Sequence, residues 1–211
     1  MFSYDPTDTS HDFTQNYKFL IGSILPRPIA WVSTKNLDGT FNIAPFSFFT
    51  AISARPMIIA FCPMTRSKDG SKKDTLVNIM REKEFVINFV TESNMDSANL
   101  TSTELPYGES EFDYAKLKTL PSTKIKAPRC EESPIHFECK LKDILSYGEG
   151  PGSGNLITGE VVQVHVQEKI MKDLKIQTDL FKPVGRGAGN DWFLCDSIIV
   201  RERLMQQQIQ K

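Results

Sequence analysis

The chain lacks the cysteine and histidine spacing that metal sites and disulfide frameworks need. Its four cysteines lie far apart and form no CxxC pair: Cys62, Cys130, Cys139 and Cys195. Its three histidines share no ligand spacing either: His11, His136 and His165. Because zinc sites need closely paired ligands, the sequence predicts no bound metal. It also gives no sign of disulfides and predicts cysteines that act as buried small apolar residues.

Neither an excess of charge nor a long apolar run is present. Lys and Arg total 25 against 26 Asp and Glu, so the formal net charge is −1. Such a balance gives no general attraction to nucleic acid or to anionic membranes. No apolar run reaches the length of a membrane span, and the polar, acidic start is unlike a secretory signal. We therefore expect no nucleic-acid or membrane partner and a cytoplasmic location.

The chain also has no internal repeat and no Gly/Ser-rich linker. Its 211 residues, 40% hydrophobic, fit one large β-rich domain or two small ones. Many short strands and few helices favour a barrel or sandwich. The predicted strands are 29–33, 57–62, 85–90, 137–144, 156–166 and 197–200. Between the first two, Asp38-Gly39 is typical of a hairpin turn.

Two helices are predicted. The first follows Ser71 and Asp74, which both offer N-cap side chains, and has an apolar stripe of Leu76, Ile79 and Met80. The second is short, spans 93–102 and is opened by Ser93. Residues 104–129 are a long excursion, which in a compact domain usually covers a site or a subunit interface.

The glycine-rich segment 148–154 joins two predicted strands. A dinucleotide-binding glycine motif must instead lead from a strand into a helix. The segment is therefore interpreted as a hairpin loop, and the sequence contains no nicotinamide-binding fingerprint of that kind.

Segment 42–53 mixes aromatic and hydroxyl side chains more closely than a core strand usually does. It contains Phe46, Phe48 and Phe49 together with Ser47, Thr50 and Ser53. Buried hydroxyls need hydrogen-bond partners, and a planar, partly polar ligand would use both kinds of group. The alternative is a hairpin with its hydroxyls facing solvent, and the segment alone leaves both interpretations open.

Cations and hydroxyls cluster just before the first predicted helix. The cluster comprises Arg66, Ser67, Lys68, Lys72, Lys73 and Thr75. A helix N-terminus offers free N–H groups and a partial positive charge, so this cluster suits a phosphate. A solvated loop is the alternative. Asp74 is expected to cap the helix, because a carboxylate would repel a phosphate.

An ordered set of motifs extends over residues 17–200. It begins with the 26–63 segment and continues with Lys73-Asp74-Thr75, Glu111-Phe112, Ser133-Pro134, 137–141, 159–166 and Gly189-Asn190-Asp191-Trp192. In this order and spacing the chain resembles the flavin reductase-like, FMN-binding split-barrel family. That family includes flavoredoxin and the reductase components of two-component flavin monooxygenases.

The resemblance implies a mainly β fold, an FMN-binding split β-barrel of antiparallel Greek-key strands with peripheral α-helices. It implies one domain over 1–211 with a core at about 17–200, and a homodimer with the flavin near the subunit interface. The implied cofactor is FMN, bound along two segments and at the helix start. The implied cofactor-binding residues are Ala30, Trp31, Val32, Ser33, Thr34, Ala44, Pro45, Phe46, Ser47, Phe48, Phe49, Thr50, Ser67, Lys73 and Thr75.

Within that set, the family's KDT motif associates Lys73 and Thr75 with the phosphate, and Ser67 comes next. Trp31 is expected to pack in the core, and His165 is expected to be structural. Arg186 and Asn190 lie in a segment that resembles a C-terminal family motif. The segment departs from it at Ala188, where Gly is usual, and at Trp192, where Tyr is usual.

No Ser-His-Asp, Cys-His or paired-carboxylate arrangement is recognisable, and no catalytic residue is assigned. A flavin enzyme needs none, because the cofactor accepts the hydride. The function implied by the resemblance is an FMN-dependent oxidoreductase that passes electrons from NADH or NADPH to free flavin or another acceptor. Two alternatives stay open: a flavin-binding electron carrier without nicotinamide turnover, and a non-catalytic split-barrel interaction protein.

Overall fold

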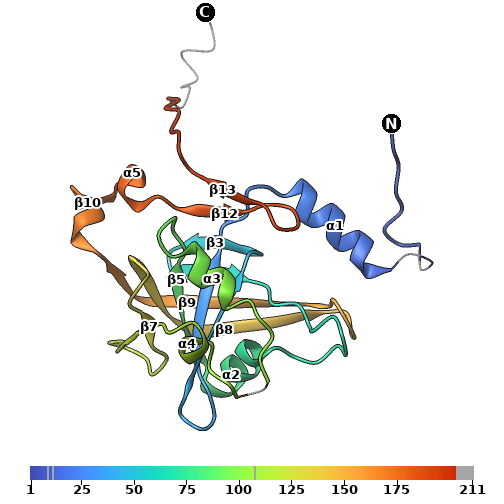
Figure 1. Cartoon of the computed structure of the whole chain (residues 1–211), viewed down its shortest axis with the longest axis horizontal. Helices are drawn as coiled ribbons and strands as arrows, with labels where there is room; N and C mark the ends of the chain where they lie inside the picture. The colour runs from blue at the N-terminus through green and yellow to red at the C-terminus, as the bar shows by residue number, and fades with distance from the viewer. Residues whose placement is uncertain (9, 11, 107, 203–211) are drawn as a thin grey trace, which may run out of the picture.

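The fold is built around one large antiparallel sheet. The computed structural model describes residues 1–8, 10, 12–106 and 108–202. Seven strands form the sheet in the order β2-β1-β5-β8-β9-β4-β3, and each neighbouring pair is antiparallel (Figure 1). Their bounds are β1 Ala30–Lys35, β2 Phe41–Phe46, β3 Phe49–Ala54, β4 Met57–Phe61, β5 Glu84–Phe89, β8 Ile135–Tyr147 and β9 Gly154–Val166. The mainly β, antiparallel prediction is confirmed.

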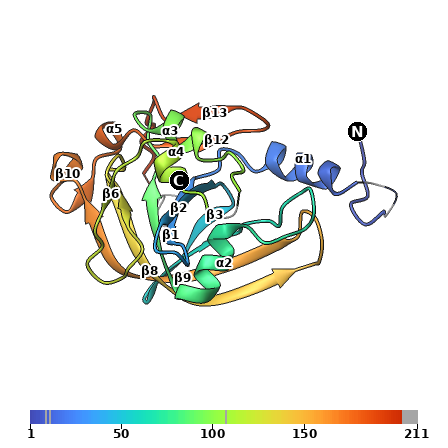
Figure 2. The same ribbon diagram turned by 60° about the horizontal axis from the view of Figure 1, so that its bottom comes forward.

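Short elements surround this sheet. The helices are α1 Phe13–Ser23, α2 Asp74–Glu82, α3 Met95–Leu100, α4 Glu111–Tyr114, α5 Thr178–Phe181 and the 3₁₀ turn η1 Glu168–Ile170. The small ladders pair β6 Thr119–Leu120 with β7 Arg129–Cys130, β10 Met171–Lys172 with β11 Lys175–Ile176, and β12 Val184–Arg186 with β13 Trp192–Leu194. Helix α1 projects from one side of the body in both views (Figures 1 and 2).

Strand β1 lies inside the sheet, between β2 and β5. Ala30 is opposite Phe46 on one side and Phe89 on the other. Because successive side chains of a strand point to opposite faces, residues 30 and 32 face one side and residues 31 and 33 the other. Both faces of β1 are covered, so its first five residues are all buried. This is why a strand with two hydroxyls and a tryptophan has no solvent face.

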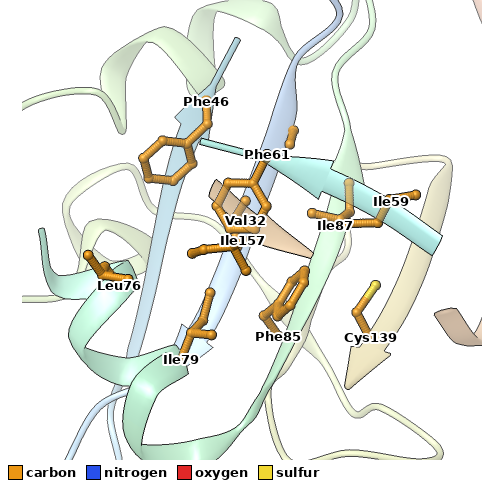
Figure 3. Packing of buried hydrophobic residues seen from close by; sticks show 11 residues of the cluster. Val32, Phe46, Ile59, Phe61, Leu76, Ile79, Phe85, Ile87, Cys139 and Ile157 are labelled. Carbon is orange, nitrogen blue, oxygen red and sulfur yellow. The ribbon is translucent and has the colours of Figure 1, made fainter. Parts of the chain in front are cut away.

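The first core cluster lies on the side of the sheet that α2 covers. Phe61 sits between Phe46 and Phe85, with ring centroids 5.4 Å from each (Figure 3). Leu76 and Ile79, three residues apart on α2, point into the same cluster. Aromatic pairs at this spacing add stabilisation beyond their buried area. The cluster fixes where α2 begins, because the helix is held to the sheet by this stripe.

The second core cluster covers the opposite face of β1. Trp31 packs there with Ala98 of α3, Phe112 of α4 and Val184 of β12. The indole N–H of Trp31 donates to the Thr101 hydroxyl at 2.8 Å. The prediction that Trp31 packs in the core is therefore confirmed. The excursion from 104 to 129 supplies α4 and the β6–β7 ladder to this face of the sheet.

The predicted helices form, but their caps differ from prediction. The N-cap of α2 is Lys73, and neither Ser71 nor Asp74 caps the helix. Asp74 is the first helical residue, and its carboxylate instead accepts a hydrogen bond from the Arg66 guanidinium at 3.0 Å. Helix α3 follows Asn94 rather than Ser93, whose hydroxyl pairs with that of Thr91.

One predicted element near the C-terminal end is wrong, and one helix near the N-terminal end was missed. The predicted strand at 197–200 has no regular secondary structure, because the antiparallel partner of β12 is the earlier segment Trp192–Leu194. Helix α1 was not predicted from the sequence. It is capped by Asp12, whose carboxylate accepts from the N–H of Thr14 at 3.1 Å. Among the helices of the described residues, none is long and apolar enough to cross a membrane.

Candidate functional site

The start of α2 leaves backbone N–H groups unpaired beside a cationic side chain. The N-cap Lys73 has extended backbone angles and makes no capping hydrogen bond with its side chain. Within the described residues, no other side chain accepts from the first N–H groups of the helix either. A helix N-terminus carries a partial positive charge, so this end of α2 suits an anion.

Two cations and two carboxylates surround this end of α2. Arg66 contacts Asp74 at 3.0 Å and Glu104 at 3.9 Å. The Glu104 side chain is 53% exposed, whereas that of Asp74 is only 10% exposed. Burial lowers the pKa of Lys73, an effect that nearby Glu104 partly opposes. Glu104 is therefore a largely exposed anion beside two cations, and an incoming phosphate would compete with it.

A buried polar network joins α2 to the sheet behind this site. Thr75 donates its hydroxyl to the amide oxygen of Asn42 at 2.9 Å. Thr34 donates to the same oxygen at 3.2 Å. The Asn42 amide nitrogen donates to the Glu111 carboxylate at 2.7 Å, and Ile43 N–H donates to it at 3.1 Å. Because the Thr75 hydroxyl proton is committed to Asn42, Thr75 can offer an anion its backbone N–H rather than its hydroxyl.

Glu111 ends that network as a buried carboxylate. Its residue is only 6% exposed, and burial raises its pKa, while hydrogen bonds from Ile43 and Asn42 oppose the rise. Glu111 belongs to α4, so the excursion 104–129 reaches the site through this contact. The excursion thus reaches the candidate site, and its covering of a functional site stays a prediction.

Two adjoining cavities open beside these groups. The large cavity has a volume of about 380 Å³ and the small cavity about 70 Å³. Pro45, Phe46, Lys73 and Glu104 line both, so the two are parts of one hollow. The large cavity is also lined by Phe13, Thr14, Tyr17, Ser47, Phe48, Cys62, Met64, Thr65, Ser67 and Gly152. Its volume lies in the ~300–1,000 Å³ range of small-molecule sites.

The lining of the large cavity combines aromatic and apolar side chains with hydroxyl and charged ones. Tyr17 of α1 lies 6.4 Å from Phe48, measured between ring centroids. Cys62 is half-buried, and burial raises the pKa of its thiol, which keeps it neutral. Lys73 and Ser67 line the same cavity, and Lys73 is the N-cap of α2. The hollow therefore combines aromatic and apolar surface with the Lys73 cation, the Ser67 hydroxyl and the Glu104 carboxylate.

The predicted hairpin between β8 and β9 is confirmed, and its tip closes one side of the large cavity. Thr65 donates its hydroxyl to Gly150 O at 2.6 Å. Gly70 has φ +72°, and a Cβ there would lie 3.0 Å from the Gly150 backbone. A Cβ on Gly152 would lie 2.4 Å from the Phe13 ring. These close approaches require glycine and hold the hairpin tip against α1 and the 65–71 loop.

The structure places the predicted cofactor-binding residues in two groups. Those that line the hollow are Ala44, Pro45, Phe46, Ser47, Phe48, Ser67, Lys73 and Thr75. Those of β1 are fully buried, with side chains that no ligand in the hollow would touch: Ala30, Trp31, Val32, Ser33 and Thr34. Ser33 donates its hydroxyl to Pro128 O, and Phe49 packs edge-on against Phe89 at 6.1 Å. Thr50 is exposed on β3, outside the hollow.

Several residues that line the hollow were not predicted from the sequence. Phe13, Thr14 and Tyr17 come from the unpredicted α1, although Phe13, Tyr17 and Ile21 have helical spacing and Asp12 precedes them as a cap. Glu104 has no local signal, because only folding brings it to Arg66.

His165, expected to be structural, lies 2.6 Å from the fully buried Glu138 carboxylate.

Comparisons with known proteins show which family the chain belongs to. A profile of the Flavin reductase like domain family matches residues 21–182. An uncharacterized protein of Halalkalibacterium halodurans is 39% identical over 180 residues, covering 84% of this chain and 86% of that protein.

Solved structures share the fold over nearly the whole chain. Nitrilotriacetate monooxygenase component B from Bacillus cereus is 33% identical with a TM-score of 0.87, covering 97% of this chain and 98% of its own. A Shewanella frigidimarina protein with a split barrel domain has a TM-score of 0.81 at 20% identity, covering 97% of this chain and 100% of its own. The mainly β split-barrel prediction is thus confirmed, and this chain belongs to the flavin reductase-like family, a family of flavin-dependent oxidoreductases.

Proposed function

We propose that this protein is an FMN-binding oxidoreductase that takes electrons from NADH or NADPH and passes them to free flavin or another acceptor. The observation that carries the proposal is the hollow beside α2, which joins an aromatic chamber to a cationic helix start. FMN has the matching shape: a planar tricyclic ring, a hydroxylated chain and a terminal phosphate. Membership of the flavin reductase-like family supports a flavin as the ligand.

The residues present fit the phosphate. Lys73 supplies a charge, the first turn of α2 supplies free N–H groups, and Ser67 supplies a hydroxyl. Arg66 is held by Asp74, so it adds to the local potential without being free to move. Glu104 leaves Arg66 when the phosphate enters, because its exposed side chain can turn into solvent. Charge-assisted contacts of this kind are the strong ones in a site.

The aromatic chamber fits the ring. Phe46, Phe48 and Tyr17 offer apolar surface, and Pro45 adds a rigid edge. When bound, the flavin supplies the hydride-accepting centre, and the protein supplies orientation and exclusion of water. The neutral Cys62 thiol adds no competing charge near the ring. The hairpin tip at Gly150–Gly152 and helix α1 close the chamber from two sides.

Enzyme activity is separated from passive electron carriage by one assay. The protein with added FMN should consume NADH or NADPH under air, measured by loss of absorbance at the reduced nicotinamide band. The control is FMN alone with the nucleotide. Flavin binding without any nucleotide consumption would favour the electron-carrier alternative, and neither activity would favour the non-catalytic alternative.

We also propose that the protein forms a homodimer. Helix α1 exposes apolar side chains along its length, and the edge strand β3 exposes Ile52 at 57%. Apolar surface of this kind is usually covered by a partner. Light scattering should give the mass of two chains, and dilution to monomer should weaken FMN binding by linkage. A monomer with undiminished FMN affinity would contradict a flavin held near the interface.

A further inference from the structure

A third cavity, which we name the Arg186 cavity, lies on the other side of the large cavity's wall. Its volume is about 200 Å³, and it shares Tyr17, Pro45 and Ser47 with the large cavity. Its other walls come from α3 and from the β12–β13 ladder, which lie on the same side of the sheet (Figure 2). A molecule in this cavity would therefore be a neighbour of whatever occupies the large one.

Arg186 lies in the Arg186 cavity as a cation without a carboxylate partner. It is opposite Trp192 in the ladder, and its guanidinium lies 5.0 Å from the centre of that indole ring. It donates to Gly189 O at 2.7 Å and to Asp191 O at 3.3 Å, both neutral backbone carbonyls. A guanidinium has five N–H donors, so others stay free. Among the described residues, no Asp or Glu side chain forms an ion pair with it.

Arg27 adds a second positive charge beside Arg186, and the cavity itself has no acidic lining. Arg27 is 4% exposed and donates to the Ser47 hydroxyl at 3.2 Å. Burial lowers the pKa of Arg27, the nearby Tyr17 side chain partly opposes this, and the charge of Arg186 lowers it further. The two guanidinium groups are thus close enough to repel, and no acidic residue lines the cavity. An anion held by Arg186 in the cavity would offset part of that repulsion.

The remaining lining offers hydrogen-bond groups and apolar surface. The Tyr17 hydroxyl and the Asn99 side-chain amide have no hydrogen-bond partner within the part of the chain that the structure describes. The Ser47 hydroxyl accepts from Arg27, so its own proton is free to be donated. Ile29 and Trp192 supply the apolar walls. A few convergent polar groups on an apolar lining are typical of a small-molecule site.

We propose that the Arg186 cavity binds the oxyanion of a small planar molecule, such as an aromatic carboxylate, next to the large cavity. Arg186 holds the oxyanion, and Tyr17, Ser47 and Asn99 complete its hydrogen bonds. The binding itself does not depend on a flavin. The further assignment of this molecule as the second reactant rests on the proposed function.

The test is a titration of the full-length protein, without flavin, with sodium benzoate and with benzamide, followed by ligand-observed NMR. Benzamide has nearly the shape of benzoate but no charge. We expect benzoate to bind at least about tenfold more tightly, since a charge-assisted hydrogen bond accounts for that difference. Arg186→Gln should abolish the preference. The matched control is Arg129→Gln, because Arg129 also donates only to a backbone carbonyl but lies in β7 and does not line the cavity.

A second variant keeps the test decisive if Arg186→Gln does not fold. Asn99 is exposed on α3, so Asn99→Asp places a carboxylate at the cavity without disturbing the core. It should weaken benzoate binding several-fold and leave benzamide unchanged. Equal affinity for benzoate and benzamide in the unmodified protein would overturn the proposal. So would a benzoate preference that survives Arg186→Gln, or one that Asn99→Asp leaves intact.

Added NADH distinguishes the two sources of such an oxyanion. Displacement of benzoate by NADH assigns the cavity to a phosphate of the nucleotide, and undisturbed benzoate assigns it to a separate acid. A parallel FMN titration separates this proposal from the proposed function. Benzoate binding without FMN binding would contradict the assignment of this molecule as the second reactant. It would still support the proposal that the Arg186 cavity binds an oxyanion.

Discussion

Replacing Lys73 by alanine should weaken the binding of FMN but not that of riboflavin. Lys73 is the N-cap of α2 and the only lysine that lines both parts of the hollow among the described residues. Its removal deletes one charge-assisted contact to a phosphate, a contribution of about 1.5–3 kcal/mol. FMN affinity should therefore fall by about tenfold to a hundredfold. The helix should persist, since Lys73 makes no capping bond with its side chain and α2 is held by Leu76 and Ile79.

Flavin fluorescence quenching measures both affinities on the same samples. Riboflavin lacks the phosphate, so it should bind the variant and the unmodified protein about equally. Lys72→Ala is the matched control, because Lys72 is exposed and lines neither part of the hollow. An equal loss for FMN and riboflavin would show general damage to the site. No loss for either would place the phosphate away from Lys73, and either result would contradict a phosphate contact at Lys73.

Two further predictions follow from charges in the structure. Glu104→Gln should raise FMN affinity about two- to fivefold and leave riboflavin unchanged, because it removes an anion that competes for Arg66. Fluorescence titration with Glu109→Gln as the control checks this, and lowered FMN affinity would contradict it. Burial lowers the pKa of His136 to about 4, so its neutral form stabilises the fold above pH 6.5. The free energy of unfolding, measured with urea, should fall by up to about 3 kcal/mol as the pH falls from 6.5 to 4. His136→Gln should flatten this dependence on pH, and an unchanged dependence in the variant would contradict the role of His136.

Local patterns predicted five of the seven strands of the large sheet and the position of α2, but they missed β2 and β3 and wrongly predicted a strand at 197–200. The Asp38-Gly39 turn joins β1 to β2, and Gly39 has φ +92°, which a hairpin turn requires. The apolar stripe of Leu76 and Ile79 placed α2 on the sheet. These features depend on neighbours in sequence, so periodicity and turn chemistry are enough to find them.

The site depends more on contacts between distant segments, which local patterns do not show. Asp74 is a residue type that often caps helices, but the Arg66 guanidinium binds its carboxylate once the 66–71 loop folds back. Ser33 and Thr34 carry hydroxyls that could bind a ligand, but these hydroxyls donate hydrogen bonds to Pro128 O and to the Asn42 side chain inside the protein. Glu104 reaches the site only through the long excursion. Eight of the predicted residues therefore line the hollow, but the sequence did not predict the contacts that their side chains make there.

The most direct test of the flavin site is whether the purified protein retains FMN. After mixing with FMN at micromolar concentration and desalting, the protein should keep flavin absorbance in proportion to its own concentration. Tightly held flavin is expected because the hollow joins an aromatic chamber to a cationic helix start. A colourless protein that shows no association with FMN at micromolar concentration would contradict the proposed function at its base.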